Sequence, residues 1–369
     1  MNSILVVLML VIMIPVFITL MFMPYLTRLT ESFGVTIPED IYHSARLKLM
    51  RKQYALITGI LSASVLVIFM LFSSSFGDNE ATISLIFGSA LVTFMASSFL
   101  VYLFFHRKME SLKIKEGWAG KKPQTVVIDT RFREQKLTHS NLWFILSFVV
   151  VIATIILTFL QYNQIPDRIP TRYNFEGDIT NWADKSYRTV LLIPIMQVYL
   201  TLLFLFINTM ITKAKQQVSV ERPEDSIRQN VIFRRAWSLF IIITGTALTL
   251  LFSFIQLSFI YPINQQALVI VPLVFSFGVT IYSIVLSFTT GQGGSRLKTQ
   301  AGKNGNVIDR DDDKYWKFGQ VYFNKNDPSL FLEKRFGIGW TINYARPVAL
   351  LILLGIVLLA ISLPMLLGA

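Results

Sequence analysis

The residues of this chain best suited to chemistry are a run of aspartates, because carboxylate oxygens are the ligands that calcium prefers. Asp309, Asp311 and Asp313 have the spacing of the first three ligands of an EF-hand loop. Such a loop also needs Gly at its sixth position and Glu at its twelfth, where this chain has Lys and Gln. We therefore predict no calcium site and interpret these aspartates, together with Asp312, as a solvated acidic run.

A glycine-rich stretch and three histidines are the other groups suited to chemistry. Residues 291–296 could bind an anion through backbone amides, but they lack the spacing of a phosphate-binding loop, so a helix end with a flexible exit is preferred. His43, His106 and His139 lack a second metal ligand at helical spacing and are expected at the surface. The chain has no Cys and no Gly-x-Ser-x-Gly motif. We predict no catalytic residue, no metal, no cofactor and no enzymatic activity.

The best candidate for ligand binding is the segment 163–188, which is rich in Pro, Asn, Gly and aromatic residues. Pro166 and Pro170 each restrict the backbone and favour extended geometry at the preceding residue. The residues Glu-Gly-Asp that follow are typical of a turn. The sequence thus predicts a small hairpin of two short strands, at residues 171–175 and 179–182.

Long apolar runs flank this segment and must position it. The chain is 53% hydrophobic and 15% charged, whereas soluble domains carry about 25% charged residues. A run of roughly 20 apolar residues can cross the hydrocarbon core. Runs without Asp, Glu, Lys or Arg lie at about 4–24, 54–74, 81–105, 141–162, 189–212, 236–257, 265–289 and 347–367. The first has no basic n-region and no small-x-small cleavage site, so we expect it to span the membrane rather than to be removed as a signal peptide.

The basic residues between these runs predict the orientation. Of the 34 Lys and Arg, 30 lie in four alternating segments and the other four lie in 163–188. Because cytosolic loops carry an excess of Lys and Arg, we predict that 25–53, 106–140, 213–235 and 290–346 are cytosolic. The predicted fold class is all-α integral membrane, a bundle of eight transmembrane helices with both termini outside. It carries a small extracytoplasmic loop motif and a small cytosolic interfacial segment.

These spans also divide the chain along its length. The first three helices with their basic loops occupy 1–140, a helix–loop–helix unit 141–212, the sixth and seventh helices 213–289, an aromatic-rich cytosolic segment 290–346, and the eighth helix 347–369. The net charge of +12 is concentrated in the predicted cytosolic segments. The anionic face of the lipid bilayer is therefore the expected partner, and nucleic acid is not.

The outer segment carries a motif that runs from Ile165 to Lys185. Its members are Ile165, Pro166, Ile169, Pro170, Thr171, Tyr173, Asn174, Gly177, Trp182 and Lys185. This pattern resembles the loop of the SdpI-like family of bacterial membrane proteins, of the type called domain of unknown function 1648. Arg172 stands where family members often carry His. The resemblance implies a bacterial membrane protein with a role in immunity, and the candidate ligand-binding residues are Pro166, Pro170, Thr171, Tyr173, Asn174, Gly177, Trp182 and Lys185.

The cytosolic segment holds nine aromatic residues between Tyr315 and Tyr344, with Lys and Arg interleaved. It resembles an uncharacterised domain of larger Gram-positive relatives. Aromatic rings suit the membrane interface, and cations suit anionic lipid, so we expect a small unit at the inner membrane face. A structural plug under the helices is the alternative to ligand binding. The candidate residues are Trp316, Gly319, Tyr322, Asn324, Asp327, Lys334, Trp340 and Asn343.

Three functions stay open at this point. The leading hypothesis is a non-enzymatic immunity or envelope-stress protein, whose outer loop engages a toxic peptide or another envelope ligand. A permease or channel for an uncharged or unknown solute is the second, since the spans contain neutral polar residues such as Gln197, Asn208 and Gln256 but no ionisable group that would indicate proton coupling. The third is a signalling protein whose cytosolic segment sequesters a cytosolic protein partner.

Overall fold

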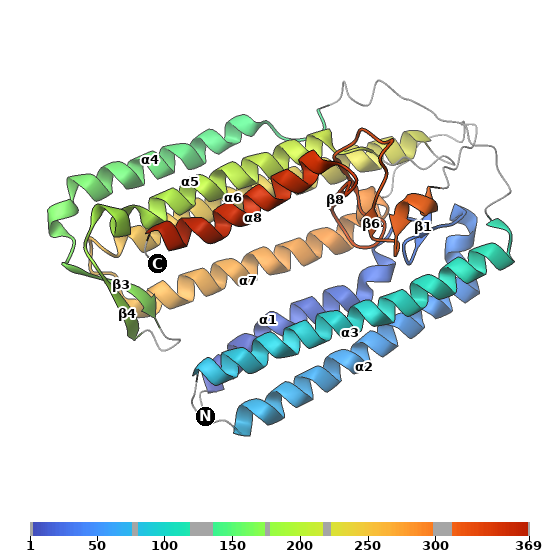
Figure 1. The fold of residues 1–369 in the computed structure, drawn as a ribbon, viewed down its shortest axis with the longest axis horizontal. Coiled ribbons are helices and arrows are strands. Elements are labelled where there is room, and N and C mark those ends of the chain that lie inside the picture. The colour runs from blue at the N-terminus through green and yellow to red at the C-terminus, as the bar shows by residue number, and fades with distance from the viewer. Residues whose placement is uncertain are drawn as a thin grey trace. The chain divides into compact units, whose positions relative to one another are not determined.

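The protein is dominated by long helices (Figure 1). The computed structural model describes residues 3–75, 80–118, 136–173, 178–216, 223–297 and 312–367. The helices are α1 (Ser3–Phe22), α2 (Ala45–Ser75), α3 (Glu80–Lys115), α4 (Phe144–Leu160), α5 (Tyr187–Lys213), α6 (Pro223–Leu257), α7 (Gln265–Thr290) and α8 (Pro347–Leu367). Within the described residues, six helices (α2 to α7) are long and apolar enough to cross a membrane, and α1 and α8 contain shorter apolar stretches. These apolar helices indicate a multi-pass membrane protein.

Every predicted apolar run coincides with a helix, but three helices are longer than the runs. Helices α2 and α6 begin at Ala45 and Pro223, before their apolar runs, and α3 continues past its own run to Lys115. The extensions carry charged side chains, so an apolar pattern cannot reveal them. A helix can continue beyond the hydrocarbon because its backbone hydrogen bonds are satisfied internally.

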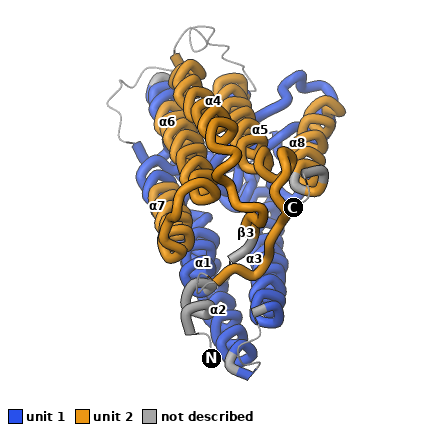
Figure 2. Tube along the Cα trace, turned by 90° about the vertical axis from the view of Figure 1, so that its left-hand side faces the viewer, with its two compact units in different colours: residues 1–134, 215–233, 284–345 blue, residues 135–214, 234–283, 346–369 orange. Residues whose placement is uncertain are grey.

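The chain folds as two compact units, each built from several stretches (Figure 2). Unit 1 comprises Met1–Glu134, Lys215–Phe233 and Ile284–Ala345, and unit 2 comprises Gln135–Ala214, Arg234–Ser283 and Arg346–Ala369. Unit 1 therefore contains α1 to α3 and most of the segments with the basic excess. Unit 2 contains α4, α5, α8, most of α6 and α7, and the segment predicted to face outward.

Two apolar clusters hold the helices of unit 1 together. The first joins α1, α2 and α3 through buried side chains that include Met13, Phe17, Phe69 and Phe94. The Phe17 and Phe94 rings lie 4.1 Å apart between their centroids. Burial of aromatic side chains of this size dominates the packing energy of a core.

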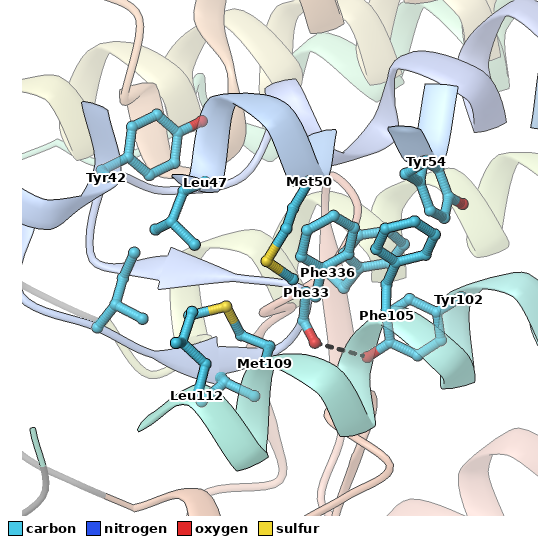
Figure 3. Packing of buried hydrophobic residues seen from close by; sticks show 12 residues of the cluster. Phe33, Tyr42, Leu47, Met50, Tyr54, Tyr102, Phe105, Met109, Leu112 and Phe336 are labelled. Carbon is cyan, nitrogen blue, oxygen red and sulfur yellow. Dashed lines mark hydrogen bonds between the residues drawn. The ribbon is translucent and has the colours of Figure 1, made fainter. Parts of the chain in front are cut away.

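The second apolar cluster packs a short hairpin against α2 and α3 (Figure 3). The hairpin consists of β1 (Glu31–Ser32) and β2 (Val35–Thr36). The ring of Phe33, at its turn, stacks on Phe105 with centroids 5.2 Å apart, and the carbonyl of Phe33 accepts a hydrogen bond from the Tyr102 hydroxyl at 3.3 Å. The turn is thus fixed on α3 by both stacking and hydrogen bonding.

Two more antiparallel hairpins complete unit 1. They are β5 (Trp316–Lys317) with β6 (Val321–Tyr322), and β7 (Phe331–Glu333) with β8 (Trp340–Ile342). A bridge from Tyr322 to Asn343 joins the two hairpins, and a bridge from Lys215 to Leu332 adds a further stretch of the chain. The aromatic-rich segment therefore folds in contact with stretches far from it in sequence.

Unit 2 is a bundle in which polar side chains form a seam between α4, α5 and α6. Thr154 and Ser253 share a hydrogen bond of 2.7 Å, and the Gln197 amide donates to the Ser253 hydroxyl at 2.9 Å. Farther along, the Asn208 amide donates to the Asn141 side-chain oxygen at 2.7 Å. Interhelical hydrogen bonds of this kind contribute about 0.6 kcal/mol each on average in membranes, so the seam specifies how the three helices pack.

Candidate functional site

The segment predicted to form a hairpin does so in unit 2, as strands β3 (Arg168–Tyr173) and β4 (Ile179–Asp184) (Figure 1). The strands are antiparallel, and Arg168 faces Asp184 while Pro170 faces Trp182. The first strand begins earlier than predicted and includes Pro170 itself. The register shifts after Pro170, which fits a residue that has no backbone N–H to donate to the ladder.

Buried isoleucines fix this hairpin to the helix ends. Ile165 and Ile169 are 2% and 1% exposed, and they pack with Val190 of α5 and with Phe259, which follows α6. Side chains alternate between the two faces of a strand. Because Ile169 points toward the helices, its neighbours Arg168 and Pro170 belong to the opposite, outward face.

Lys185 connects the end of the hairpin to its beginning. Its ammonium group donates to the carbonyl of Ile165 at 2.7 Å and lies 4.8 Å from the centre of the Tyr162 ring. Its backbone N–H donates to Asp167 at 2.8 Å. Ser186 then caps α5 by accepting a hydrogen bond from the Thr189 N–H at 3.1 Å. The motif lysine therefore connects the two ends of the hairpin, and the next residue, Ser186, caps the helix that follows.

The outward face of the hairpin combines an aromatic ring with a pair of opposite charges. Trp182 is 49% exposed, and it lies opposite Pro170 in the ladder. The adjacent pair on the same face is Arg168 and Asp184. Sequence reasoning missed these two charged residues, although the alternation of side chains along predicted strands would have placed them beside Trp182.

The remaining predicted residues of the outer segment are placed as follows. Pro166 and Thr171 are exposed, and Pro170 is half-buried. Tyr173 ends β3, where its backbone pairs with Ile179. Asn174 and Gly177 lie outside the described residues, so their predicted roles stay predictions.

Several candidate residues of the aromatic-rich segment bond to one another in unit 1. The hydroxyl of Tyr322 donates to the carboxylate of Asp327 at 2.8 Å, and Lys215 forms an ion pair with the same carboxylate. Asn343 donates to the backbone carbonyl of Asn324 at 2.9 Å. Burial alone would raise the pKa of Asp327, but hydrogen bonds from Lys215 and neighbouring donors lower this pKa to about 2. These side chains bond to neighbouring groups of unit 1, as residues that hold a segment in place do.

The other candidates of that segment have different surroundings. Trp316 is buried beneath the guanidinium of Arg335, which lies 5.1 Å from its ring centre. Gly319 has a φ of +67°, and an added Cβ would lie 2.6 Å from the Tyr102 hydroxyl, so only glycine fits.

Trp340 is half-buried and its ring lies 5.5 Å from Phe233. Lys334 is exposed.

A network of buried charges in unit 1 was not predicted from the sequence. Arg28 pairs with Glu333, and Arg335 pairs with both Asp312 and Asp313. The prediction that Asp312 and Asp313 belong to a solvated acidic run is therefore wrong, because both are partly buried in ion pairs. Asp309 and Asp311 lie outside the described residues.

Burial and ion pairing in this network shift the pKa values of Asp313 and Glu31 in opposite directions. Burial would raise the pKa of Asp313, but the cations of Arg335 and Lys113 outweigh burial and hold this pKa below its usual value. Lys113 donates to Asp313 at 2.7 Å. Glu31 has a weaker partner, since its nearest contact with Arg28 is 3.6 Å, and burial raises the pKa of Glu31 to about 7.

Two further expectations from the sequence are corrected by the structure. The stretch after α7 is an ordered structural element rather than a flexible exit, because Gln292 is fully buried and its amide donates to the carbonyls of Lys334 and Gly339 at 3.1 and 3.0 Å. His106 is not a surface residue. It is 5% exposed, and its Nδ1 lies 2.8 Å from the Phe33 carbonyl.

The described residues contain no group of three or more His, Cys, Asp or Glu side chains that could hold a metal ion. The hairpin face offers one carboxylate and one guanidinium rather than an acid–base pair. An aromatic ring, a charged pair and strand backbone are groups that can contact a ligand.

Comparison with known proteins gives two domain matches. Residues 149–198 match a domain of unknown function (DUF1648), and residues 325–350 match a family of unknown function (DUF5808). The first match covers most of α4, the β3–β4 hairpin and the first part of α5. The second begins in the aromatic-rich segment and reaches the start of α8. No curated protein and no solved structure matches the chain.

The first match supports a family of proteins that contain a DUF1648 domain, as the loop motif predicted. The narrower assignment to the SdpI-like family stays a prediction. Neither match carries a known activity, so the function has to be argued from the geometry.

Proposed function

We propose that this chain is a non-enzymatic protein of the bacterial cell membrane that protects the cell against a membrane-active peptide by binding it at the β3–β4 hairpin. In this proposal the eight helices span the membrane, the hairpin faces outward, and the basic segments of unit 1 lie in the cytosol. The SdpI-like motif favours immunity among the functions of a binding surface.

The observation that carries the proposal is a hairpin anchored at its base, with a free strand edge beside an exposed tryptophan. Within the described residues, β3 and β4 form a sheet of two strands only, so each strand has an unpaired edge. Extended peptides commonly bind by adding a strand to such an edge. Strand β3 contains Pro170, whereas β4 (Ile179–Asp184) has no Pro, so each N–H that points to the free edge of β4 can donate to an added strand. The free edge of β4 is therefore the better template.

Side chains on the outward face would add specificity to this backbone pairing. Trp182 offers a large apolar contact at the depth where indoles are favourable in membranes. Arg168 and Asp184 present both signs of charge beside it, so a peptide with charged and apolar residues would find partners for both. Rigid anchoring by Ile165, Ile169 and Lys185 lowers the entropic cost of binding.

The test is protection of a sensitive Gram-positive host that lacks related genes. Cells that express the wild-type chain are challenged with a panel of membrane-active peptides, and survival is compared with that of cells expressing Trp182→Ala. Tyr261→Ala is the matched control, because Tyr261 is also an exposed aromatic residue (45%) and lies two residues after Phe259, which packs against the hairpin base.

The proposal expects selective protection by the wild type and by Tyr261→Ala, and its loss in Trp182→Ala at equal membrane levels. Full protection by Trp182→Ala would show that protection does not depend on peptide binding at the hairpin face. Absence of protection against every peptide in the panel would refute immunity as the function.

Passage of a small uncharged solute is a second candidate, favoured by the seam in unit 2. The side-chain oxygens of Gln197 and Gln256 are buried there without a hydrogen-bond partner among the described residues. Unpaired buried acceptors are costly, and a solute that donates hydrogen bonds would satisfy them. Solute flux in proteoliposomes that is lost in Gln197→Leu would support this candidate, and absence of flux for a panel of polyols and amides would refute it.

A further inference from the structure

Helix α3 passes from apolar to basic residues where its apolar run ends. The helix carries no charged residue from Ala81 to Phe105 and then presents His106, Arg107 and Lys108 in succession. On its exposed side a hollow of about 400 Å³ is lined by Leu100, Leu103, Phe104, Arg107, Lys108 and Ser111. These residues are spaced three or four apart, so they share one face of the helix. The hollow is apolar at one end and cationic at the other.

A second hollow of about 350 Å³ continues from the first, since Leu103 and Arg107 line both. Its other wall comes from Lys314, which precedes β5, and from Lys317 and Phe318 of the hairpin β5–β6. All these residues belong to unit 1. We refer to the two adjoining hollows as the groove; it has exposed leucine and phenylalanine side chains in the first hollow and a group of basic side chains in the second.

The tip of the β5–β6 hairpin holds a phenylalanine in a strained position. Phe318 has a φ of +54°, which costs an L-residue energy, and its ring is 57% exposed. The conformation is fixed because the Phe318 carbonyl accepts a hydrogen bond from the Tyr102 hydroxyl at 2.8 Å. A strained residue that exposes a large apolar ring is unfavourable for folding alone, and such strain often marks a functional position.

The basic side chains of the groove are not neutralised by the acids near them. Arg107, Lys314 and Lys317 form no ion pair within the described residues. Of the two acids in the groove, Asp313 is bound to Arg335 and Lys113. Glu110 lies 3.6 Å from His106. The groove therefore keeps an excess of positive charge beside exposed apolar side chains.

We propose that this groove binds an anionic phospholipid, with the phosphate on Arg107, Lys314 and Lys317 and the acyl chains along Leu100 and Phe104. Phe318 enters the interface beside the headgroup, where aromatic rings are favourable. The ligand chemistry is a phosphate diester joined to an apolar tail, which matches a groove that is cationic at one end and apolar at the other. The proposal does not depend on peptide binding by the outer hairpin.

The test measures lipid binding to the purified full-length protein in detergent by native mass spectrometry. The probes are dioctanoyl phosphatidylglycerol, dioctanoyl phosphatidylcholine and inorganic phosphate. The variant is Arg107→Gln/Lys317→Gln. The matched control is Lys48→Gln/Lys52→Gln, which removes the same charge from exposed positions of α2. Circular dichroism and size-exclusion chromatography verify that each variant is folded.

We expect tighter binding of phosphatidylglycerol than of phosphatidylcholine. The groove variant should lose about tenfold or more of that affinity, since each basic residue near an anionic lipid contributes appreciably, and the control should lose less than about threefold. Equal losses in the two variants would show general charge attraction and overturn the site. Inorganic phosphate that binds as tightly as phosphatidylglycerol would overturn the lipid assignment in favour of free phosphate.

Discussion

Glutamate 31 offers a quantitative test of the buried charge network in unit 1. Glu31 is 4% exposed, and one of its carboxylate oxygens has no hydrogen-bond partner among the described residues. Arg28, Arg335, Asp312 and Asp313 act on it electrostatically. Because burial dominates, the pKa of Glu31 rises from its ordinary value of 4.5 to about 7. Below about pH 7 the folded protein therefore favours the protonated form.

The size of the effect follows from this shift in pKa. The folded state binds the proton more tightly than the unfolded state, so the stability contributed by the neutral form is complete below pH 4.5 and is lost as the pH rises through 7. One pKa unit corresponds to about 1.4 kcal/mol. The wild type should thus lose up to about 3 kcal/mol of unfolding free energy through this residue between pH 4.5 and 8.

The perturbation is Glu31→Gln, which keeps the size of the side chain and removes its titration. Denaturant unfolding in detergent, followed by tryptophan fluorescence, gives the unfolding free energy at each pH. The difference between variant and wild type should be small near pH 5 and should grow in favour of the variant by about pH 8. Glu116→Gln, at an exposed ion pair with Arg46, is the control. A difference that does not change with pH would refute the reasoning.

Three further predictions concern single side chains. Lys185→Met removes the bond to the Ile165 carbonyl and should cost about 1–3 kcal/mol, seen as faster proteolysis within the hairpin at unchanged helix content; unchanged proteolysis would contradict the role of Lys185. Phe318→Gly should raise stability by about 1 kcal/mol by relieving the positive φ and should weaken phosphatidylglycerol binding, and a loss of stability would show that no strain is stored there. Asp327→Asn removes a carboxylate whose pKa is lowered from 3.8 to about 2 in the folded protein. The variant should therefore lose less unfolding free energy than the wild type as the pH falls from 3.8 toward 2. An acid transition that matches the wild type would exclude Asp327 as its origin.

The sequence predicted the features that depend on local pattern. Apolar runs without charge identified the helices, because crossing hydrocarbon requires such a run. Pro166, Pro170 and the turn residues identified the hairpin, because they restrict the backbone locally. Each of these depends on neighbours within a few residues.

The features that the sequence did not reveal depend on distant residues. The partner of Arg28 is Glu333, and Asn230 also donates to that carboxylate, at 2.8 Å, so three separate stretches build one buried group. Such a contact leaves no periodic pattern in the sequence. The role of Lys185 was also hidden, because its acceptor is a backbone carbonyl, and every residue carries one. In the aromatic-rich segment, the bridge from Leu332 to Lys215 likewise joins stretches that are far apart in the sequence.

The orientation of the chain is the premise of the proposed outer peptide site, and one labelling experiment tests it directly. The chain has no Cys, so an introduced cysteine is the only thiol of this chain that a maleimide can label. Thr180→Cys reports on the exposed side of β4, and Lys325→Cys reports on an exposed turn of unit 1. A membrane-impermeant maleimide should label Thr180→Cys in intact cells and Lys325→Cys only after permeabilisation. The opposite pattern would place the hairpin in the cytosol and contradict the account.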